Sequence, residues 1–430
     1  MKIGIIGAGF SGLSAAYELS KSGHKVFVFE KESSPGGLAI GFSASGWKWR
    51  LEKHYHHFFV SDWAIRNLAE EIGHNVEFKR PITSIFVDGR FHQLDSPSNL
   101  LKFKKLSLVS RLRTGAILFY LKATPFWKSL EGITAKIFLK RWVGEESWRV
   151  LWKPLFEKKF GNYANKIPAS WFWARIKKRS ASLGYPRGGF QALAESLQKS
   201  IETRGGKFFF GVSVDEISKK GELISLNFSG KTQDFDRVIC TLPTPLFLKI
   251  TKGLPANYVS RLKPLKGLGA VNLVLVLNKP FLPGHEYWLN VNQEGFPFLA
   301  VVEHTNLVSS ENYGNNTVIY VGNYLESSHK YFGYEAQQLI EEFLPYLRKI
   351  NPNFGKSMVV RSFVFKTPFA QPVVPLNYSK MLPSITTPIR GLLLANIQQV
   401  YPWDRGTNYA VELGKKVAFY AQPDSFGLKH

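Results

Sequence analysis

The sequence predicts a mixed α/β protein with more than one domain, and three observations support this fold class. The chain has 430 residues, which is more than one ordinary hydrophobic core accommodates. Hydrophobic residues make up 44% of the chain and charged residues 20%, as in packed globular proteins. Strand-like and helix-like apolar patterns alternate from the N-terminus onward. The single cysteine, Cys240, excludes a disulfide framework within the chain and a cysteine-rich metal site.

The first thirty residues predict a Rossmann-type nucleotide-binding unit. A strand (3–6) leads into Gly7-Ala8-Gly9-Phe10-Ser11-Gly12, a helix (13–22) follows, and a second strand (24–29) ends at Glu30. A G-x-G-x-x-G motif between two strands, with an acidic residue after the second, binds dinucleotides. We expect Gly7 to make the tight turn, Gly9 to let the backbone approach a pyrophosphate and Gly12 to allow close helix packing. Glu30 is expected to accept a hydrogen bond from a ribose hydroxyl.

A second pair of glycines indicates the kind of dinucleotide. The segment Ser34-Pro35-Gly36-Gly37-Leu38-Ala39 follows the acidic residue closely. At this point the sequence resembles the flavin amine oxidase superfamily, which includes protoporphyrinogen oxidases and phytoene desaturases. The resemblance implies FAD as the cofactor, with the paired glycines near the flavin end of FAD. Leu38 stands where that family usually has an arginine.

The resemblance continues along most of the chain. Three later segments are similar to FAD-domain segments of the family. The first is Tyr185-Pro186-Arg187-Gly188-Gly189-Phe190 with a helix at 191–204, and the second is a pair of strands at 208–214 and 236–241. The third is a strand at 391–396 with a helix from 407 to about 420. One departure is Ala395-Asn396, where Gly-Asp is usual. The FAD-binding residues implied are Gly7, Ala8, Gly9, Phe10, Ser11, Gly12, Glu30, Lys31, Gly36, Gly37, Leu38, Val214 (through its backbone, at the adenine), Asn396, Gly406, Thr407 and Tyr409.

A histidine-rich segment, His54-Tyr55-His56-His57, supplies the candidate catalytic residues. On a strand, His54 and His56 would share one face, and Tyr55 and His57 the other. Because imidazole titrates near neutral pH, the three histidines are predicted to form an acid–base group near the flavin, with Tyr55 contacting substrate. Two alternatives stay open: histidines packed among nearby aromatic residues, and a metal site, although no carboxylate triad or cysteine accompanies them.

A second candidate cluster, Tyr401-Pro402-Trp403-Asp404-Arg405, precedes the last predicted helix. Tyr401 and Trp403 are expected to wall a substrate pocket, and Arg405 to bind an anionic group of the substrate or the FAD phosphates. Arg187 is a further candidate of the same kind. The alternatives are a turn fixed by an Asp404–Arg405 pair, and, for Arg187, a solvated surface arginine.

Positive charge is concentrated in one region of the chain. The net charge is +24, and residues 97–179 contain 19 Lys/Arg against 4 Asp/Glu together with six of the 11 tryptophans. Their apolar residues recur at helical spacing. Three interpretations are open: contact with an anionic membrane surface, a helical subdomain with tryptophan in its core, and nucleic-acid binding, which no recognisable motif supports.

These patterns predict three parts. Residues 1–80, 185–245 and 388–430 form a discontinuous FAD-binding domain, 97–180 a basic, Trp-rich helical insertion, and 255–385 a mixed-sheet substrate domain. In the last part, strands are expected at 270–277, 298–303, 317–324 and 358–365, and a helix with an apolar, core-facing stripe at 334–349. In the families that the chain resembles, the mixed sheet covers the flavin and a helical insertion touches the membrane.

Three functions follow from these expectations. The first is an FAD-dependent oxidoreductase that oxidises or desaturates an apolar or amphipathic, lipid-like substrate by hydride transfer to flavin. The second resembles UDP-galactopyranose mutase, a flavin-dependent isomerase of a nucleotide sugar. The third is a flavin-free prenyl-lipid-binding protein of the same fold.

The sequence contains no signal for export or membrane insertion. No run reaches the roughly 18 apolar residues of a membrane-spanning helix. The N-terminus leads directly into a strand rather than into a signal peptide. The expected location is therefore cytoplasmic, with contact at the inner membrane face open and no nucleic-acid partner expected.

Overall fold

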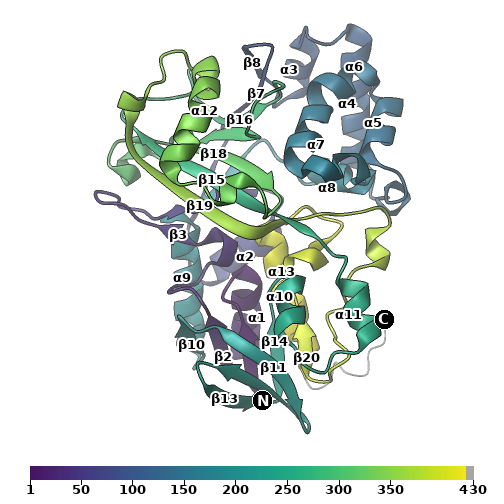
Figure 1. Ribbon diagram of the computed structural model, residues 1–430, viewed down its shortest axis with the longest axis vertical. Coiled ribbons are helices and arrows are strands. Elements are labelled where there is room, and N and C mark those ends of the chain that lie inside the picture. Colours follow the sequence, from purple (N-terminus) through teal and green to yellow (C-terminus); the bar gives the residue numbers. More distant parts are fainter. Residues whose placement is uncertain (423–430) are drawn as a thin grey trace.

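The nucleotide-binding part is built on a parallel five-stranded sheet, shown at the bottom of Figure 1. The computed structural model describes residues 1–422. The strand order is β10-β2-β1-β14-β20, with bounds β1 Lys2–Ile6, β2 Lys25–Glu30, β10 Lys207–Phe210, β14 Arg237–Cys240 and β20 Leu392–Leu394. Three long helices accompany it: α1 Phe10–Lys21, α9 Gly189–Glu202 and α13 Thr407–Tyr420. The strands are apolar because both faces of the sheet are covered.

One predicted strand of this part is wrong in its length. The sequence predicts a strand over 208–214, but β10 ends at Phe210 and the chain turns at Gly211, whose φ is +67°. Val214 begins another strand in a separate antiparallel sheet, formed by β11 Val214–Lys220, β12 Leu223–Phe228 and β13 Lys231–Phe235. A residue with positive φ interrupts a strand, and glycine adopts it without steric strain.

The second part is a seven-stranded mixed sheet. Its order is β19-β15-β18-β17-β16-β7-β8, with bounds β7 Ile82–Val87, β8 Arg90–Gln93, β15 Gly267–Leu277, β16 Glu286–Val291, β17 Ala300–Glu303, β18 Thr317–Leu325 and β19 Val359–Pro372. The helix α12, Ala336–Ile350, buries the apolar stripe that the sequence predicts to face the core. The sequence patterns did not predict β16. Residues 82–93, which the predicted domains left unassigned, form β7 and β8 and join this sheet because β7 pairs in parallel with β16 and β8 pairs with β7.

The third part is the helical insertion, at the upper right of Figure 1. Its helices are α3 Pro97–Lys102, α4 Leu108–Ala123, α5 Ala135–Trp142, α6 Glu145–Ser147, a π-helical turn Trp148–Trp152, α7 Lys153–Phe160 and α8 Ala169–Lys177. Trp148, Trp171 and Trp173 are buried, whereas Trp142 is exposed. Trp127 and Trp152 are partly buried against the same core, so five of the six tryptophans contribute to it. Within residues 1–422, every helix is too short or too polar to cross a bilayer.

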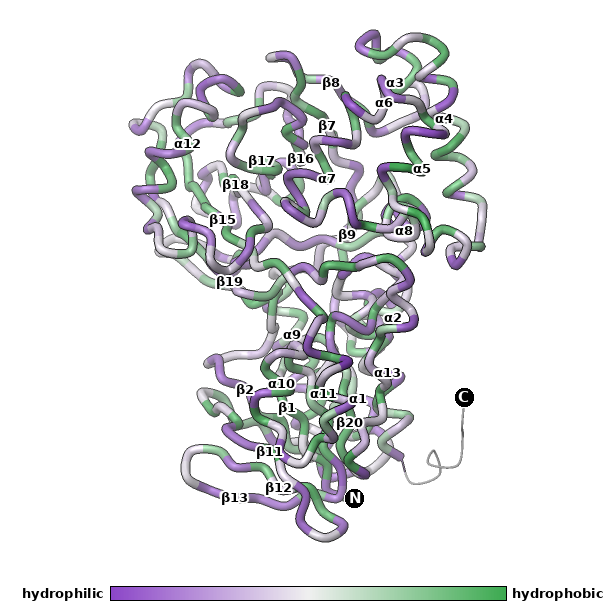
Figure 2. The backbone as a smooth tube through the Cα atoms, turned by 45° about the vertical axis from the view of Figure 1, so that its right-hand side comes forward, coloured by the Kyte–Doolittle hydropathy of each residue, from purple (hydrophilic) through white to green (hydrophobic). Residues whose placement is uncertain are grey.

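Short elements join the three parts. The five-stranded sheet and the two upper parts meet at a narrower waist, visible in Figures 1 and 2. The connecting elements are β3 Gly41–Phe42, β4 Leu51–Glu52, β5 Phe58–Phe59, α2 Trp63–Glu71, β6 Val76–Lys79, β9 Leu183–Pro186, α10 Thr244–Ile250 and α11 Ala256–Leu262. The histidine segment lies between β4 and β5 and contacts the seven-stranded sheet through Asn272 and Tyr287. It therefore lies between the nucleotide-binding part and that sheet.

Candidate flavin and substrate site

The glycine-rich loop joins β1 to α1 and leaves no room for side chains at two positions. A Cβ on Gly7, whose φ is +102°, would lie 2.4 Å from Thr241 Oγ1, and a Cβ on Gly12 would lie 2.0 Å from the Gly7 carbonyl oxygen. Gly9 is the N-cap of α1, and no described side chain caps the first-turn N–H groups. Uncapped N–H groups at the positive end of a helix dipole bind anions such as a pyrophosphate.

Glu30, at the end of β2, is held beside this loop. Its carboxylate accepts hydrogen bonds from the backbone N–H of Ala8 (2.7 Å) and of Glu32 (2.9 Å), and its carbonyl accepts from Val212 N–H (2.9 Å). The segment that leads into Val214 therefore lies next to Glu30, where the resemblance implies the adenine. Lys31 points to solvent and pairs with Glu32 at 3.7 Å.

The paired glycines lie directly against the glycine-rich loop. Gly36 donates its N–H to the Ala8 carbonyl (2.9 Å), and the two backbones form a bridge between Gly9 and Gly36. Gly37 has a φ of +58°, and a Cβ there would lie 2.9 Å from Gly9 Cα. A side chain at Gly37 would therefore collide with the Gly9 backbone. The positive φ of Gly37 disfavours any residue other than glycine as well. Leu38 follows in the 3-10 turn Gly37–Ala39 and is half-buried.

Asn396, which replaces the family's aspartate, is engaged inside the protein. Its side-chain amide donates to the Leu242 carbonyl and to the Thr244 hydroxyl, both at 3.1 Å, and its Oδ1 caps the following turn by accepting from Gln398 N–H (3.1 Å). A carboxylate has no proton to donate and would face the Leu242 carbonyl with like partial charge. The substitution thus has a local structural reason, the hydrogen bond to Leu242.

The last helix supplies a second uncapped N-terminus. Gly406 is the N-cap of α13 without a side-chain cap bond, and the buried Thr407 Oγ1 has no hydrogen-bond partner among residues 1–422. A buried hydroxyl without a partner is costly unless a ligand satisfies it. The helix is fixed against α1, where Ser14 Oγ donates to the Val411 carbonyl at 3.0 Å.

These features fit a dinucleotide such as FAD. The N-terminus of α1, the close approach of Gly9 and Gly37, and the unsatisfied Thr407 hydroxyl together provide anion-binding N–H groups, a passage without side chains and a free polar group. Glu30 and Val214 would hold the adenosine end, the loop from Gly7 to Gly12 the pyrophosphate, and Gly37 and Thr407 the flavin end. Bound FAD would supply a hydride acceptor.

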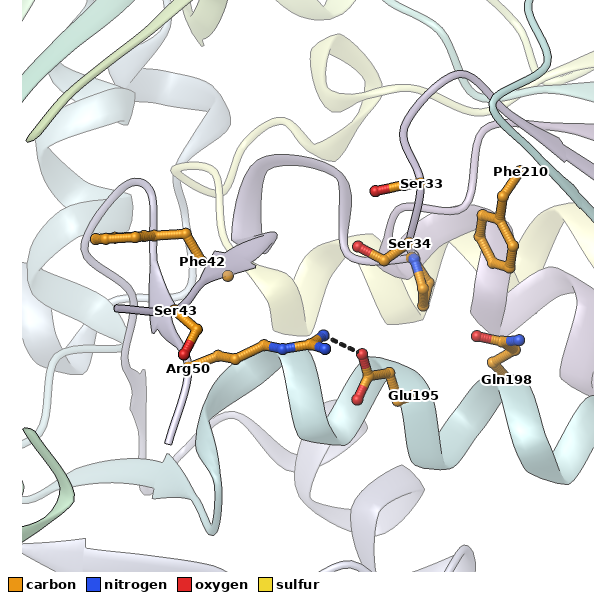
Figure 3. A pocket seen from close by; sticks show the side chains of 10 residues that line it. Ser33, Ser34, Phe42, Ser43, Arg50, Glu195, Gln198 and Phe210 are labelled. Atoms are coloured by element: carbon orange, nitrogen blue, oxygen red, sulfur yellow. Dashed lines mark hydrogen bonds and ion pairs between the residues drawn. The ribbon is translucent and has the colours of Figure 1, made fainter. Parts of the chain in front are cut away.

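A cavity of about 630 Å³ opens to solvent nearby but is a separate feature. It is lined by Ser33, Ser34, Pro35, Gly41, Phe42, Ser43, Arg50, Glu195, Gln198 and Phe210. Figure 3 shows Arg50 reaching across it to Glu195 on α9, with which it forms an ion pair. None of the implied FAD-binding residues lines this cavity, so it is a surface depression between the paired-glycine segment and α9 rather than the flavin cleft.

The histidine segment is enclosed by protein. Asn272 Nδ2 donates to His54 Nδ1 (2.5 Å), His56 Nδ1 donates to the His54 carbonyl (2.6 Å), and His57 Nδ1 bonds the Tyr287 hydroxyl (3.0 Å). Burial lowers the pKa of His54 and of His57 to about 3, and that of His56 to about 4. The three imidazoles are therefore neutral at pH 7. Within residues 1–422 no group of metal-ligating side chains accompanies them.

Four basic side chains from distant segments gather beside the histidines. Lys159 of α7 lies 3.3 Å from Asp404, and Arg405 donates to Gln371 Oε1 (2.8 Å) and to the Tyr324 hydroxyl. Burial lowers the pKa of Lys159 to about 7, against the opposing effect of Asp404. Burial would raise the pKa of Asp404, but Lys159 and Arg175 outweigh it and the pKa lies below its ordinary value.

The other two cations are Arg175, in the last turn of α8, and Arg179, which lies two residues beyond the end of that helix. Burial lowers the pKa of both guanidinium groups. The pKa of Arg179 falls to about 10, and the positive charge of the nearby Arg175 contributes to that fall. Burial also lowers the pKa of the three histidines. Their side chains and those of Arg175, Arg179 and Arg405 nevertheless keep some solvent-accessible surface. Arg179 is exposed, whereas Arg175, Arg405 and the three histidines are partly buried.

Aromatic side chains complete the walls of this site. Trp403 stacks on Trp173 (centroids 5.1 Å apart) and on Tyr409 (5.7 Å), and the Tyr55 hydroxyl lies 3.3 Å from that of Tyr324. The Lys178 ammonium lies 5.0 Å from the Trp403 ring centroid, and the Arg405 guanidinium 4.6 Å from that of Tyr324, so these rings offer apolar contacts beside cations. The site therefore combines an aromatic wall with a cationic one.

The structure brings some predicted substrate residues together and leaves others apart. Tyr55, Trp403 and Arg405 meet at the cationic group, but Tyr401 is buried behind them and its hydroxyl bonds Ser170 Oγ at 2.8 Å. Arg187 is exposed at the turn between β9 and α9 and does not join them. Asp404 and Arg405, which the alternative interpretation paired in a turn, are linked by a hydrogen bond from the Arg405 backbone N–H to the side-chain Oδ1 of Asp404 (3.1 Å).

Sequence reasoning missed five residues of the site or its support: Glu52, Lys159, Arg175, Arg179 and Tyr324. Glu52 is fully buried and accepts from Phe190 N–H (2.7 Å) and the Tyr185 hydroxyl (2.8 Å), which anchors the histidine segment to α9. Arg175 lies in α8 and Arg179 lies two residues beyond its end, so helical spacing gave no signal for the pair. Nothing in the sequence distinguished them from the surrounding surface cations.

Comparison with known proteins assigns the chain to a family. Residues 10–418 match the family of flavin-containing amine oxidoreductases, to which the chain belongs. This family agrees with the class that the sequence predicts, an FAD-dependent oxidoreductase. The chain is 27% identical over 301 residues to a zeta-carotene desaturase of Synechocystis sp., and 26% identical over 284 residues to a 4,4'-diapophytoene desaturase of Staphylococcus haemolyticus. The first match covers 60% of each chain, and the second 57% of this chain and 56% of the relative.

Solved structures confirm the predicted fold. A reduced UDP-galactopyranose mutase superposes with a TM-score of 0.77 at 17% identity, over 99% of this chain and 96% of that one. A putative protoporphyrinogen oxidase from Exiguobacterium sp. 255-15 superposes with a TM-score of 0.74 at 16% identity, over 97% and 98% of the two chains. The sequence matches to the two desaturases, by contrast, cover less than two thirds of the length of each desaturase.

Proposed function

We propose that the protein uses FAD to oxidise or desaturate an amphipathic substrate that carries an anionic group, by hydride transfer to the flavin. The observation that carries this proposal is the cluster of Lys159, Arg175, Arg179 and Arg405 beside the histidine segment. The carboxylates near these cations are Asp404 and, for Arg179, Asp95. Positive charge therefore remains in excess at this site.

The excess charge argues against a purely hydrocarbon substrate. Covering these cations with a hydrocarbon would be unfavourable, because it would remove their water without replacing its hydrogen bonds. A carboxylate or phosphate satisfies them, and guanidinium groups bind such anions through two hydrogen bonds. The apolar part of the substrate would lie on Trp403 and Tyr409, which are stacked.

The histidines would serve as neutral hydrogen-bonding groups rather than as cations. Because His56 donates from Nδ1 to the His54 carbonyl, its Nε2 is the nitrogen that can accept a proton from the substrate. A pKa near 4 makes it a weak base at rest. An anionic substrate beside it would raise that pKa and make proton acceptance easier.

Anaerobic flavin reduction tests the proposal. The FAD-loaded protein is mixed with a prenyl diphosphate, with the matching uncharged prenyl alcohol, with a carboxylated porphyrinogen and with a carotenoid-precursor hydrocarbon, and bleaching of the flavin absorbance is followed. An anionic member of the set should reduce the flavin. Arg179→Gln should raise the concentration needed for half-maximal rate by about tenfold or more, the loss expected for one charge-assisted contact. Arg149→Gln, an exposed arginine of the same insertion, is the matched control. Equal reduction by the hydrocarbon in wild type and Arg179→Gln would refute the anionic requirement.

A second candidate rests on the same cations. A diphosphate would pair with Arg175, Arg179 and Arg405 as well as a carboxylate does, which favours a flavin-dependent isomerisation of a nucleotide sugar. This candidate predicts saturable quenching of flavin fluorescence by UDP-galactose and tighter binding after dithionite reduction. Absence of binding in both redox states removes it.

A further inference from the structure

The solvent-open cavity beside α9, with a volume of about 630 Å³, has the size of a small-molecule site. Its walls come from segments that are distant in the chain: the loop 33–35, β3, the residue before β4, α9 and the end of β10. Figure 3 shows Phe42 and Phe210 on opposite sides of the cavity, with the Arg50–Glu195 ion pair between them. The chemistry of these walls indicates which class of ligand the cavity can hold.

The charges that line the cavity cancel. Arg50 and Glu195 are the two charged residues of its lining, and they form an ion pair whose side chains stay 47% and 42% exposed. A phosphate or carboxylate bound to Arg50 would be repelled by Glu195, and an ammonium bound to Glu195 would be repelled by Arg50. The pair instead offers guanidinium N–H donors and carboxylate acceptors to a neutral ligand.

Uncharged polar groups surround this ion pair. Ser33, Ser34 and Ser43 contribute hydroxyls that have no protein hydrogen-bond partner in the described part of the chain. Gln198 donates from Nε2 to Glu202 (2.9 Å), which leaves its Oε1 as an acceptor. Because a hydroxyl both donates and accepts, these groups match a ligand that is itself rich in hydroxyls. An acyl chain would displace their water without replacing its hydrogen bonds.

A buried side chain holds this lining in position. Gln191 is fully buried, donates from Nε2 to Glu195 Oε1 (3.0 Å) and accepts at Oε1 from Gly41 N–H (2.9 Å). The half-buried rings of Phe42 and Phe210 add apolar faces to the same walls. A sugar ring has matching surfaces, since its C–H groups pack on aromatic rings while its hydroxyls bond to polar groups placed in advance.

We propose that this cavity binds a neutral sugar, with its hydroxyls bonded to the Arg50–Glu195 pair and the three serines and its ring faces against Phe42 and Phe210. The volume leaves room for more than one sugar ring, and the open mouth admits the end of a larger molecule. The ligand is therefore a free disaccharide or the sugar headgroup of a glycolipid. The site is separate from the flavin cleft, and binding there does not require the substrate proposed above.

Saturation-transfer difference NMR on the flavin-loaded full chain tests the proposal. The free sugars are maltose, cellobiose, lactose and sucrose, and octyl glucoside below its critical micelle concentration represents a glycolipid headgroup. At least one of these neutral ligands should bind saturably, with a dissociation constant of about 1 mM or below. Binding of a disaccharide identifies a free-sugar site, and binding of octyl glucoside alone identifies a glycolipid site.

Two variants that remove one charge each provide the specificity check. Glu195→Gln leaves Arg50 without its counter-charge, so glucuronate should bind about tenfold or more tightly than to wild type. Arg50→Gln should do the same for glucosamine, and both variants should bind the neutral sugar about threefold or more weakly. Both side chains are partly exposed, so flavin content and the thermal midpoint should match wild type.

Lys199→Gln, exposed on α9 and outside the cavity lining, is the matched control and should bind every ligand as wild type does. Two results would overturn the proposal. The first is that none of the neutral sugars binds wild type saturably. The second is that binding is the same in wild type, Glu195→Gln and Arg50→Gln, because the sugar would then lie elsewhere on the protein.

Discussion

The buried carboxyl of Glu52 should make the stability of the protein depend on pH in a defined direction. Burial raises its pKa from 4.5 to about 7, against the effect of the hydrogen bonds from Phe190 N–H and the Tyr185 hydroxyl. A raised folded-state pKa means that the folded protein binds a proton more tightly than the unfolded chain does. Its contribution to stability is therefore fully present below pH 4.5 and is lost as the pH rises through 7.

The size of the effect follows from the shift. The difference between 4.5 and about 7 corresponds to about 3 kcal/mol in total, of which about 2.5 kcal/mol falls between pH 5 and pH 8. Glu52→Gln keeps a hydrogen-bond acceptor for Phe190 N–H and cannot ionise. The difference in unfolding free energy between wild type and Glu52→Gln should therefore change by about 2–3 kcal/mol over this pH range, in favour of the variant at high pH.

Urea unfolding of the flavin-loaded proteins at pH 5 to 8 measures this difference. Glu202→Gln, exposed at the end of α9, is the matched control and should track wild type at every pH. A wild-type minus Glu52→Gln difference that stays constant with pH would show that the carboxyl is ionised throughout, and would refute the reasoning from burial.

Two further predictions concern the cofactor cleft. Gly37→Ala adds a Cβ 2.9 Å from Gly9 Cα at a φ of +58°. Flavin content after purification should therefore fall, and the FAD dissociation constant should rise about tenfold or more. Unchanged flavin content would contradict the assignment of the space between Gly9 and Gly37 to FAD. Asn396→Asp removes the proton donated to the Leu242 carbonyl. Urea unfolding should therefore show an unfolding free energy lower by about 1–3 kcal/mol, and this loss should grow from pH 6 to pH 8 as the carboxyl ionises. A variant as stable as wild type would show that this hydrogen bond is unimportant.

The nucleotide-binding part could be predicted from the sequence because its signals are local. Gly7, Gly12 and Glu30 lie within one strand–helix–strand unit, and their spacing reports the backbone geometry directly. The error at 208–214 is local as well: the positive φ at Gly211 separates two strands that read as one apolar run. Strands β7 and β8 were left unassigned because β7 joins the sheet through β16, which is about 200 residues away in the chain, and β8 joins it through β7.

The cationic site could not be predicted because it depends on tertiary contacts. Lys159, Arg175 and Arg405 come from α7, α8 and the loop before α13, and each has the sequence context of a surface cation. Glu52 gave no signal, since its burial depends on α9 folding over it. The histidine segment was predicted to lie near the flavin and does lie beside the cations, and its catalytic role stays a prediction.

The most direct measurement is the visible absorbance spectrum of the purified protein, before and after denaturation. If the loop from Gly7 to Gly12, the paired glycines and the N-terminus of α13 hold FAD, the protein is yellow, shows two flavin bands, and releases FAD when unfolded. A colourless protein that also fails to take up added FAD would contradict the assignment of this cleft to the cofactor.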